Sequence, residues 1–341
     1  MPKTSLFQDA NPDIDCRECD LHRQLFDSCL LLARTLMYDT RYDDALSVVE
    51  SQHLRQWPGN APLGNLFEIE ILEAEILQRK HRDSGIDQEP VMVLIDDLKS
   101  RTLESGECLC LGQLLKVKAK AIMERELAAG RSYDAALKPL ERALELFEEA
   151  DGKVGIAQAL FSVGLVYEFR RESGPEDKAK AAKYHTNARQ LAADIGDRRI
   201  QSYAARHLAG VRHYQSDVED ALALYEESLA LREQLGYRGL LPGAYDAVAA
   251  IHLEMGHLDE AQGFIQQTKR WSLEKGFQRY VLLAELRAGE VLEKQGHIAE
   301  SIEHYTEALK VGQETGFQPG IEMARVATAR LQQDAAGDGG C

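Results

Sequence analysis

The sequence predicts an all-α protein made of stacked helical hairpins, and three observations support that fold class. First, four glycines in the C-terminal half, Gly196, Gly236, Gly276 and Gly316, are each 40 residues apart. Second, apolar residues between these glycines recur at three- and four-residue steps, which is the spacing of one face of an α-helix. Third, one helical hairpin cannot bury its apolar face alone, so a regular repeat indicates that neighbouring hairpins stack.

Each repeat is expected to contain two helices. Residues 201–214 and 218–235 each carry an apolar stripe, and a polar turn at 216–217 separates them. The glycine that follows each second helix suits a left-handed cap, because a side chain is strained in that conformation. Gly256 and Gly296, also 40 residues apart, are expected in the turn between the two helices.

This pattern resembles the tetratricopeptide repeat (TPR). That family places a small residue in the first helix, a glycine in the turn, and then an alanine, an aromatic and a second small residue along the second helix. The matching positions are Ala33, Gly164, Ala209, Ala249 and Gly289 for the first small residue, Ala45, Ala136, Ala181, Ala221 and Ala261 for the alanine, and Tyr225 and Tyr305 for the aromatic. Val49, Leu140 and Ile265 replace the aromatic elsewhere.

The repeat of 40 residues is longer than the usual TPR of about 34. It is similar to the variety found in MalT-like regulators, kinesin light chains and Rap phosphatases. The resemblance implies a right-handed α-α superhelix of about seven repeats with a C-terminal capping helix.

Domain boundaries follow from this register. We expect a partly flexible leader at 1–24, a TPR solenoid at 25–333 and a flexible tail at 334–341. The expected units are 25–56, 63–106, 109–152, 154–197, 199–237, 240–277 and 280–317, with the cap at 319–333.

Composition narrows the classes of partner. The 341 residues include 40 Lys and Arg against 56 Asp and Glu, a net charge of −16. Affinity for nucleic acid or anionic lipid depends on clustered Lys and Arg, so we expect neither partner. The chain shows no apolar run of the roughly 18 residues that span a bilayer and no signal-peptide region at its start. These features predict a cytoplasmic protein, and its 6 cysteines are expected to be reduced thiols.

The sequence shows no catalytic motif. It has no H-E-x-x-H, no glycine-rich phosphate loop that ends in Lys-Ser or Lys-Thr, and no G-x-S-x-G, and its 10 histidines are scattered. We therefore expect no enzyme activity and no cofactor.

One segment near the N-terminus has the spacing of metal ligands. Cys16, Cys19 and His22 are potential zinc ligands, and Cys29 would complete a set of four. The alternative is a leader without metal, because no second pair of cysteines or histidines lies nearby.

The resemblance directs one face of each first helix into a concave groove. The side chains expected there are Arg34, Gln158, Phe161, Glu168, Tyr203, Arg206, His213, Asp246, Glu290 and Glu293. Arg34, Arg206 and His213 suit an acidic or phosphorylated segment, whereas Glu290 and Glu293 suit a basic one. The alternative is that all of these residues are ordinary solvated surface.

Co-chaperones of this family clamp a C-terminal carboxylate with a Lys and an Asn. The matching positions carry Leu30, Phe161, Arg206, Asp246 and Leu286 for the Lys, and Arg34, Leu165, Gly210, Ala250 and Glu290 for the Asn. Only Arg206 fits, so a co-chaperone role is not expected.

The sequence therefore predicts a scaffold or adaptor whose groove binds a peptide or helix of another protein. A regulatory sensor that binds a small peptide or metabolite and changes its compactness is the alternative. Self-association into a homo-oligomer through exposed solenoid ends also stays open.

Overall fold

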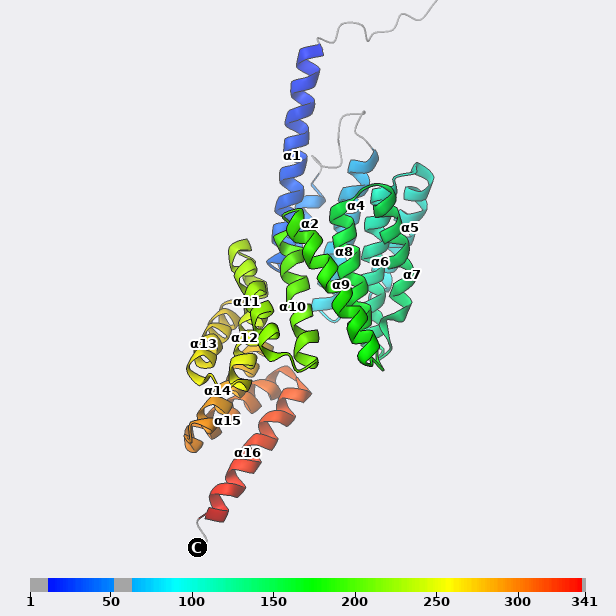
Figure 1. The fold of residues 1–341 in the computed structure, drawn as a ribbon. Helices are drawn as coiled ribbons and strands as arrows, with labels where there is room; N and C mark the ends of the chain where they lie inside the picture. The colour runs from blue at the N-terminus through cyan, green and yellow to red at the C-terminus, as the bar shows by residue number, and fades with distance from the viewer. Residues whose placement is uncertain (1–11, 52–62, 339–341) are drawn as a thin grey trace, which may run out of the picture. The chain divides into compact units, whose positions relative to one another are not determined.

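The structure, a computed structural model, describes residues 12–51 and 63–338, with side chains described for 23–51 and 66–333. Every regular element in these ranges is a helix: fifteen α-helices and two short 3₁₀-helices, with no strand (Figure 1). Within each unit, the described α-helices pack against their neighbours in the chain, which confirms the predicted all-α repeat fold. The chain folds as two units, residues 1–129 and 130–341.

The first unit contains five described helices. They are α1 (Pro12–Tyr38), α2 (Tyr42–Val49), α4 (Leu63–Asp83), α5 (Glu89–Ser105) and α6 (Cys108–Ala128). Helix α1 begins inside the segment 1–24 that we expected to be a leader. Proline suits the first turn of a helix, and residues 13–24 contain no glycine or further proline to interrupt it. The first helix therefore begins at Pro12, ahead of the predicted repeat boundary at residue 25.

The second unit contains ten α-helices, which correspond closely to the regular part of the sequence pattern. They are α7 (Leu137–Glu149), α8 (Lys153–Glu168), α9 (Pro175–Asp194), α10 (Arg198–Tyr214), α11 (Val218–Leu235), α12 (Leu241–Glu254), α13 (Leu258–Lys275), α14 (Gln278–Lys294), α15 (Ile298–Thr315) and α16 (Gln318–Asp338). Short 3₁₀ turns at Tyr133–Ala136 and Arg238–Leu240 precede α7 and α12.

Glycine ends three of the second helices in the predicted conformation. Gly236, Gly276 and Gly316 follow α11, α13 and α15 with φ of 67°, 72° and 70°. The turns at Gly256 and Gly296 are also left-handed, with φ of 78° and 83°. These conformations strain any residue with a Cβ, so the regular glycine spacing sets where each helix stops.

The helices of the second unit form two layers. Each helix packs on the next in the chain, and first helices also contact one another, as in the pairs α8–α10, α12–α14 and α14–α16. We call α8, α10, α12, α14 and α16 the first-helix layer. Second helices make no comparable contacts with one another among the described residues, so the stack is tighter along the first-helix layer.

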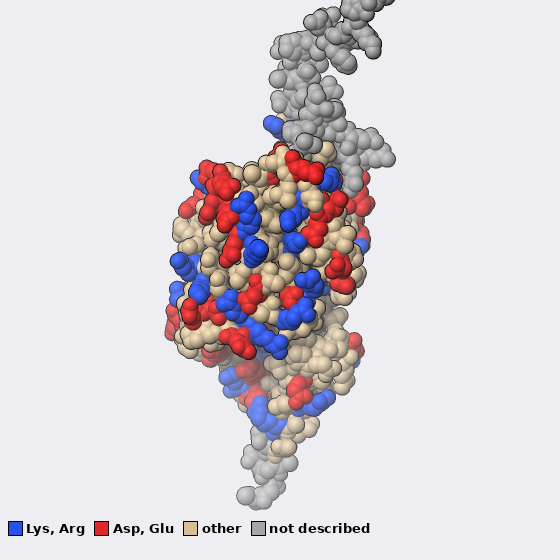
Figure 2. Space-filling view, turned by 90° about the vertical axis from the view of Figure 1, so that its right-hand side faces the viewer, with Lys and Arg blue, Asp and Glu red and all other residues tan. Residues whose placement is uncertain are grey.

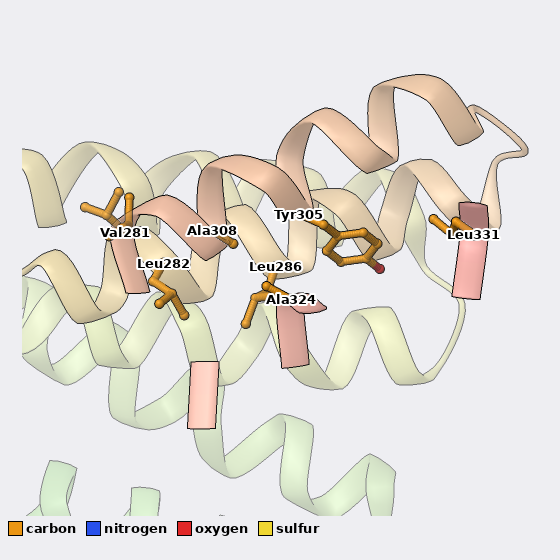
Figure 3. Packing of buried hydrophobic residues seen from close by; sticks show 8 residues of the cluster. Val281, Leu282, Leu286, Tyr305, Ala308, Ala324 and Leu331 are labelled. Carbon is orange, nitrogen blue, oxygen red and sulfur yellow. The ribbon is translucent and has the colours of Figure 1, made fainter. Parts of the chain in front are cut away.

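The hydrophobic core is a chain of small clusters between successive helices. The last cluster, drawn in Figure 3, joins α14, α15 and α16 through Val281, Leu282, Leu286, Tyr305, Ala308, Val311, Ala324 and Leu331. Helix α16 covers this cluster with Ala324 and Leu331, which are 0% and 3% exposed. The final helix therefore closes the apolar end of the stack, as repeat proteins require.

No described helix is long and apolar enough to cross a membrane.

Candidate functional site

Several predicted groove charges form ion pairs between successive first helices. In the first unit, Arg34 on α1 lies 2.8 Å from Glu68 on α4. In the second unit, contacts between an acidic side chain and an Arg or His recur along the first-helix layer between residues 37 to 41 positions apart, close to one repeat. The N–O distances are 2.9 Å for Glu168–His207, 2.6 Å for His213–Glu254, 2.6 Å for Asp246–Arg287 and 2.7 Å for Glu293–Arg330.

These pairs change how the predicted groove is charged. Arg34, Asp246 and Glu293 each have an oppositely charged partner on a neighbouring first helix, and His213 contacts the Glu254 carboxylate, so none of them is an isolated groove residue. Figure 2 shows Lys and Arg interspersed with Asp and Glu on the face that it displays. On that face the net charge of −16 is not gathered into a single acidic patch.

The other predicted groove residues differ in exposure. Phe161 is buried, whereas Gln158, Tyr203 and Arg206 are half-buried. The centre of the Phe161 ring lies 5.9 Å from the centre of the Tyr203 ring. The guanidinium of Arg232 lies 5.3 Å from the centre of the same Tyr203 ring. Tyr203 thus belongs in part to the packing between helices and is not wholly available to a ligand.

A pocket of about 130 Å³ opens between α14, α15 and α16. Its walls are mostly apolar, and its charged lining comes from α14; the lining residues are Leu283, Leu286, Arg287, Glu290, Tyr305, Met323 and Ala327. Met323 is 56% exposed at this site, so the pocket reaches the surface. Of the predicted groove residues, Glu290 lines this pocket, and Glu293 lies one helical turn further along α14 and accepts a hydrogen bond from Tyr305 at 3.1 Å.

A second site was not predicted as a unit: a carboxylate that bridges two imidazoles. Glu168 ends α8, His185 lies on α9 and His207 lies on α10. Glu168 Oε2 is 2.9 Å from His185 Nε2 and 2.9 Å from His207 Nδ1. We call these three residues the Glu-His-His cluster. It joins three consecutive helices from two adjacent repeats.

Local packing explains the position of His185. It lies four residues after Ala181, just as Tyr225 lies four residues after Ala221 and Tyr305 four residues after Ser301. His185 therefore occupies the aromatic position of its repeat, and it is fully buried. Its ring also lies 5.6 Å from the Phe161 ring.

Glu168 has a counterpart in the last repeat. It lies four residues after the small residue Gly164, as Glu293 lies four residues after Gly289. In the last repeat the hydroxyl of Tyr305 donates a hydrogen bond to Glu293. In the repeat of α8 and α9, the imidazole of His185 takes the place of the tyrosine and contacts Glu168.

The environment of the Glu-His-His cluster affects its charge state. Burial alone would raise the pKa of Glu168, but the two imidazoles lower it to about 2 through charge and hydrogen bonding. Burial lowers the pKa of His207, against the opposing effect of the Glu168 carboxylate. At neutral pH the cluster therefore holds an ionised carboxylate and a neutral His207.

The donor atoms of the Glu-His-His cluster all lie within 4.8 Å of one another, which is close enough to hold a metal ion. Among the His, Cys, Asp and Glu side chains that the structure describes, these three form such a group. The candidate ligands Cys16, Cys19 and His22 have side chains outside the described residues. Cys29 and Cys108 are free thiols, and burial raises the pKa of Cys110 to about 11.

The comparisons with known proteins support the fold. No family model matches the chain, and no curated protein matches it. A signal-transduction ATPase with a tetratricopeptide repeat sensor from Pyrococcus horikoshii is 13% identical, with a TM-score of 0.61 over 78% of this chain. The present chain covers 40% of that protein. A Rap protein complexed with competence and sporulation factor is 10% identical over 92% of this chain and 99% of its own, with a TM-score of 0.47. The chain has the helical solenoid fold of TPR proteins, as the sequence predicts.

Proposed function

We propose that the chain is a non-catalytic scaffold or adaptor that binds a segment of a partner protein along the first-helix layer. The pocket between α14, α15 and α16 is the observation that carries this proposal. Its volume of about 130 Å³ is close to that of an engineered protein cavity, about 150 Å³, that holds one benzene ring. We infer that the pocket receives one apolar side chain of the partner.

The rim of the pocket favours a basic residue beside that apolar anchor. Asp246 holds Arg287 through two hydrogen bonds, of 2.6 and 3.3 Å, so this cation is already compensated. Arg330 likewise holds Glu293 at 2.7 Å. Glu290 adds one negative charge to these balanced pairs. A Lys or Arg next to a Leu, Met or Phe complements this arrangement.

A displayed library of random peptides tests the proposal directly. Peptides selected on the full chain are expected to share an apolar residue next to a basic one. Met323→Glu, which places a charge at the pocket, is expected to weaken binding at least tenfold. Val326→Glu is the matched control, because Val326 lies on the same helix and is also 56% exposed but does not line the pocket.

Two further results bear on the proposal. Glu290→Lys is expected to remove the preference for a basic residue, and equal binding by Met323→Glu and wild type contradicts the assignment of the pocket. A scaffold keeps its X-ray scattering profile when the selected peptide binds. A change in radius of gyration would instead favour the regulatory sensor.

A further inference from the structure

We propose that Glu168, His185 and His207 form a binding site for one Zn²⁺ ion that ties α8, α9 and α10 together. The site is distinct from the pocket of the proposed function. Different residues form it, and it lies at the junction of two other repeats.

The donor atoms are close to the geometry that zinc requires. Glu168 Oε2, His185 Nε2 and His207 Nδ1 all lie within 4.8 Å of one another, and the carboxylate oxygen is 2.9 Å from each nitrogen. Ligands about 2.0–2.1 Å from a tetrahedral zinc are about 3.4 Å apart. The two oxygen–nitrogen separations therefore need to grow by about half an ångström, which small side-chain rotations allow.

The chemistry of the donors selects the class of metal. Two imidazoles and one carboxylate are a known zinc ligand set, whereas Ca²⁺ and Mg²⁺ prefer oxygen ligands alone. The Glu168 carboxylate is the acidic member of this ligand set, and its Oε2 lies against both imidazoles. The three ligands leave a fourth position for water. The side chains of Glu168 and His207 are 11% and 15% exposed, so an ion can enter from the surface.

Packing holds the ligands in place before any metal binds. The fully buried imidazole of His185 is fixed between the backbone of Gly164 and the Phe161 ring. Without metal, His185 Nε2 donates its proton to Glu168, and metal binding moves that proton to Nδ1.

Two features limit the affinity of the site. His185 Nδ1 is buried and has no hydrogen-bond partner within the described residues. Zinc-binding histidines usually donate this second N–H to another group, and losing such a partner costs about 10–100-fold in affinity. The positive charge of Arg206 also acts on His207. We therefore expect a micromolar dissociation constant, and a tighter one in Arg206→Gln.

Cobalt(II) titration of the full chain, first freed of metal by a chelator, tests the site. We expect one Co²⁺ per chain, a visible d–d absorption band, and displacement of Co²⁺ by Zn²⁺. His185→Tyr is expected to weaken binding at least 100-fold and still fold, because tyrosine occupies the same position in two other repeats. The matched control is His213→Gln, which removes a histidine that pairs with Glu254 outside the cluster and is expected to bind Co²⁺ as wild type does.

Cysteine ligation has to be separated from the proposed site. Thiolate ligands give Co²⁺ an intense near-ultraviolet charge-transfer band, which the Glu-His-His cluster does not produce. The double variant Cys16→Ser/Cys19→Ser is expected to retain binding. The proposal is overturned if folded wild-type protein binds no Co²⁺, if His185→Tyr binds it as tightly as wild type, or if the cysteine variant loses it.

Discussion

Gly164 lies directly against the imidazole ring of His185. A Cβ added at residue 164 would come within 2.6 Å of the ring carbon Cε1. The same contact recurs in the last repeat, where a Cβ at Gly289 would come within 2.8 Å of the Tyr305 ring. The small residue of the first helix is thus required by the ring that the second helix presents to it.

Gly164→Ala is therefore expected to destabilise the protein by about 1–3 kcal/mol, the usual cost of overpacking a core. Gly263→Ala is the matched control, since Gly263 is also helical but a Cβ there meets nothing within 4 Å. That change is expected to stabilise by about 0.5–1 kcal/mol, because alanine favours a helix over glycine. Urea denaturation of both variants measures the difference, and equal effects would contradict the close packing.

The ion pairs of the first-helix layer are expected to differ in strength according to burial. The side chains of Asp246 and Arg287 are 13% and 25% exposed, whereas those of Glu254 and His213 are 48% and 41% exposed. Asp246→Ala leaves a largely buried guanidinium without its acceptor, at an expected cost of about 1.5–3 kcal/mol. Glu254→Ala breaks an exposed pair and is expected to cost at most about 1 kcal/mol. Similar losses of unfolding free energy in the two variants would show that burial does not distinguish the pairs.

The regular repeats of the second unit could be predicted because the left-handed backbone conformation at the ends of α9, α11, α13 and α15 favours a glycine, and these glycines are visible in the sequence. Gly196, Gly236, Gly276 and Gly316 all have positive φ, with values of 74°, 67°, 72° and 70°. A requirement of this kind repeats at a fixed interval and is visible without any knowledge of tertiary contacts. The start of α1 at Pro12 is different, because no such marker separates residues 12–24 from the helix that follows.

The Glu-His-His cluster was harder to predict because its register is interrupted. Glu168 and His185 are 17 residues apart, whereas the equivalent Glu293 and Tyr305 are 12 apart. The longer connection between α8 and α9 hides the equivalence when residues are counted from one end. Counting from Ala181 reveals it, since His185 lies at the aromatic position four residues later.

Partners of the predicted groove charges could not be identified from local pattern. Arg330, which pairs with Glu293, lies on α16, 37 residues later in the chain. Such a pair depends on how two repeats stack, and no periodic marker reports the side chains that meet. The volume of the pocket between α14, α15 and α16 likewise depends on the side chains of three helices together.

Acid is expected to remove the contribution of the pair between Glu293 and Arg330. Hydrogen bonding to Arg330 is the main reason that the pKa of Glu293 is lowered. A carboxyl whose folded-state pKa lies below its unfolded value stabilises the protein above the unfolded pKa, about 4.3 for Glu, and loses this effect as the pH falls. Arg330→Met is therefore expected to cost about 0.5–1 kcal/mol at pH 7 and less at pH 3.

Arg325→Met provides the control for that experiment. Arg325 also lies on α16, but its pair with Glu322 is exposed and within the same helix, at 3.3 Å. It is expected to change the unfolding free energy by about 0.3 kcal/mol or less at both pH values. Guanidinium chloride is unsuitable because its salt screens such pairs, so urea curves at the two pH values are the measurement. A cost for Arg330→Met that does not shrink in acid would contradict the assigned cause.

Helix α16 is expected to contribute to stability through the apolar face that it places over α14 and α15. Leu331 belongs to the last core cluster (Figure 3) and is 3% exposed. Val326 on the same helix is 56% exposed. Leu331→Ala is expected to cost about 2–4 kcal/mol, because it removes buried methyl groups and leaves a cavity. Val326→Ala is expected to change the unfolding free energy by about 0.5 kcal/mol or less.

Hydrogen exchange locates where the Leu331→Ala effect is felt. Because stability in a repeat protein is roughly a sum over neighbouring repeats, losing the cover at one end loosens the adjacent helices first. Amides of α14, α15 and α16 are therefore expected to exchange faster in Leu331→Ala, while those of α9 and α10 keep their wild-type rates. Uniformly faster exchange along the second unit would contradict this reasoning, because the end helix would then be coupled to the whole stack.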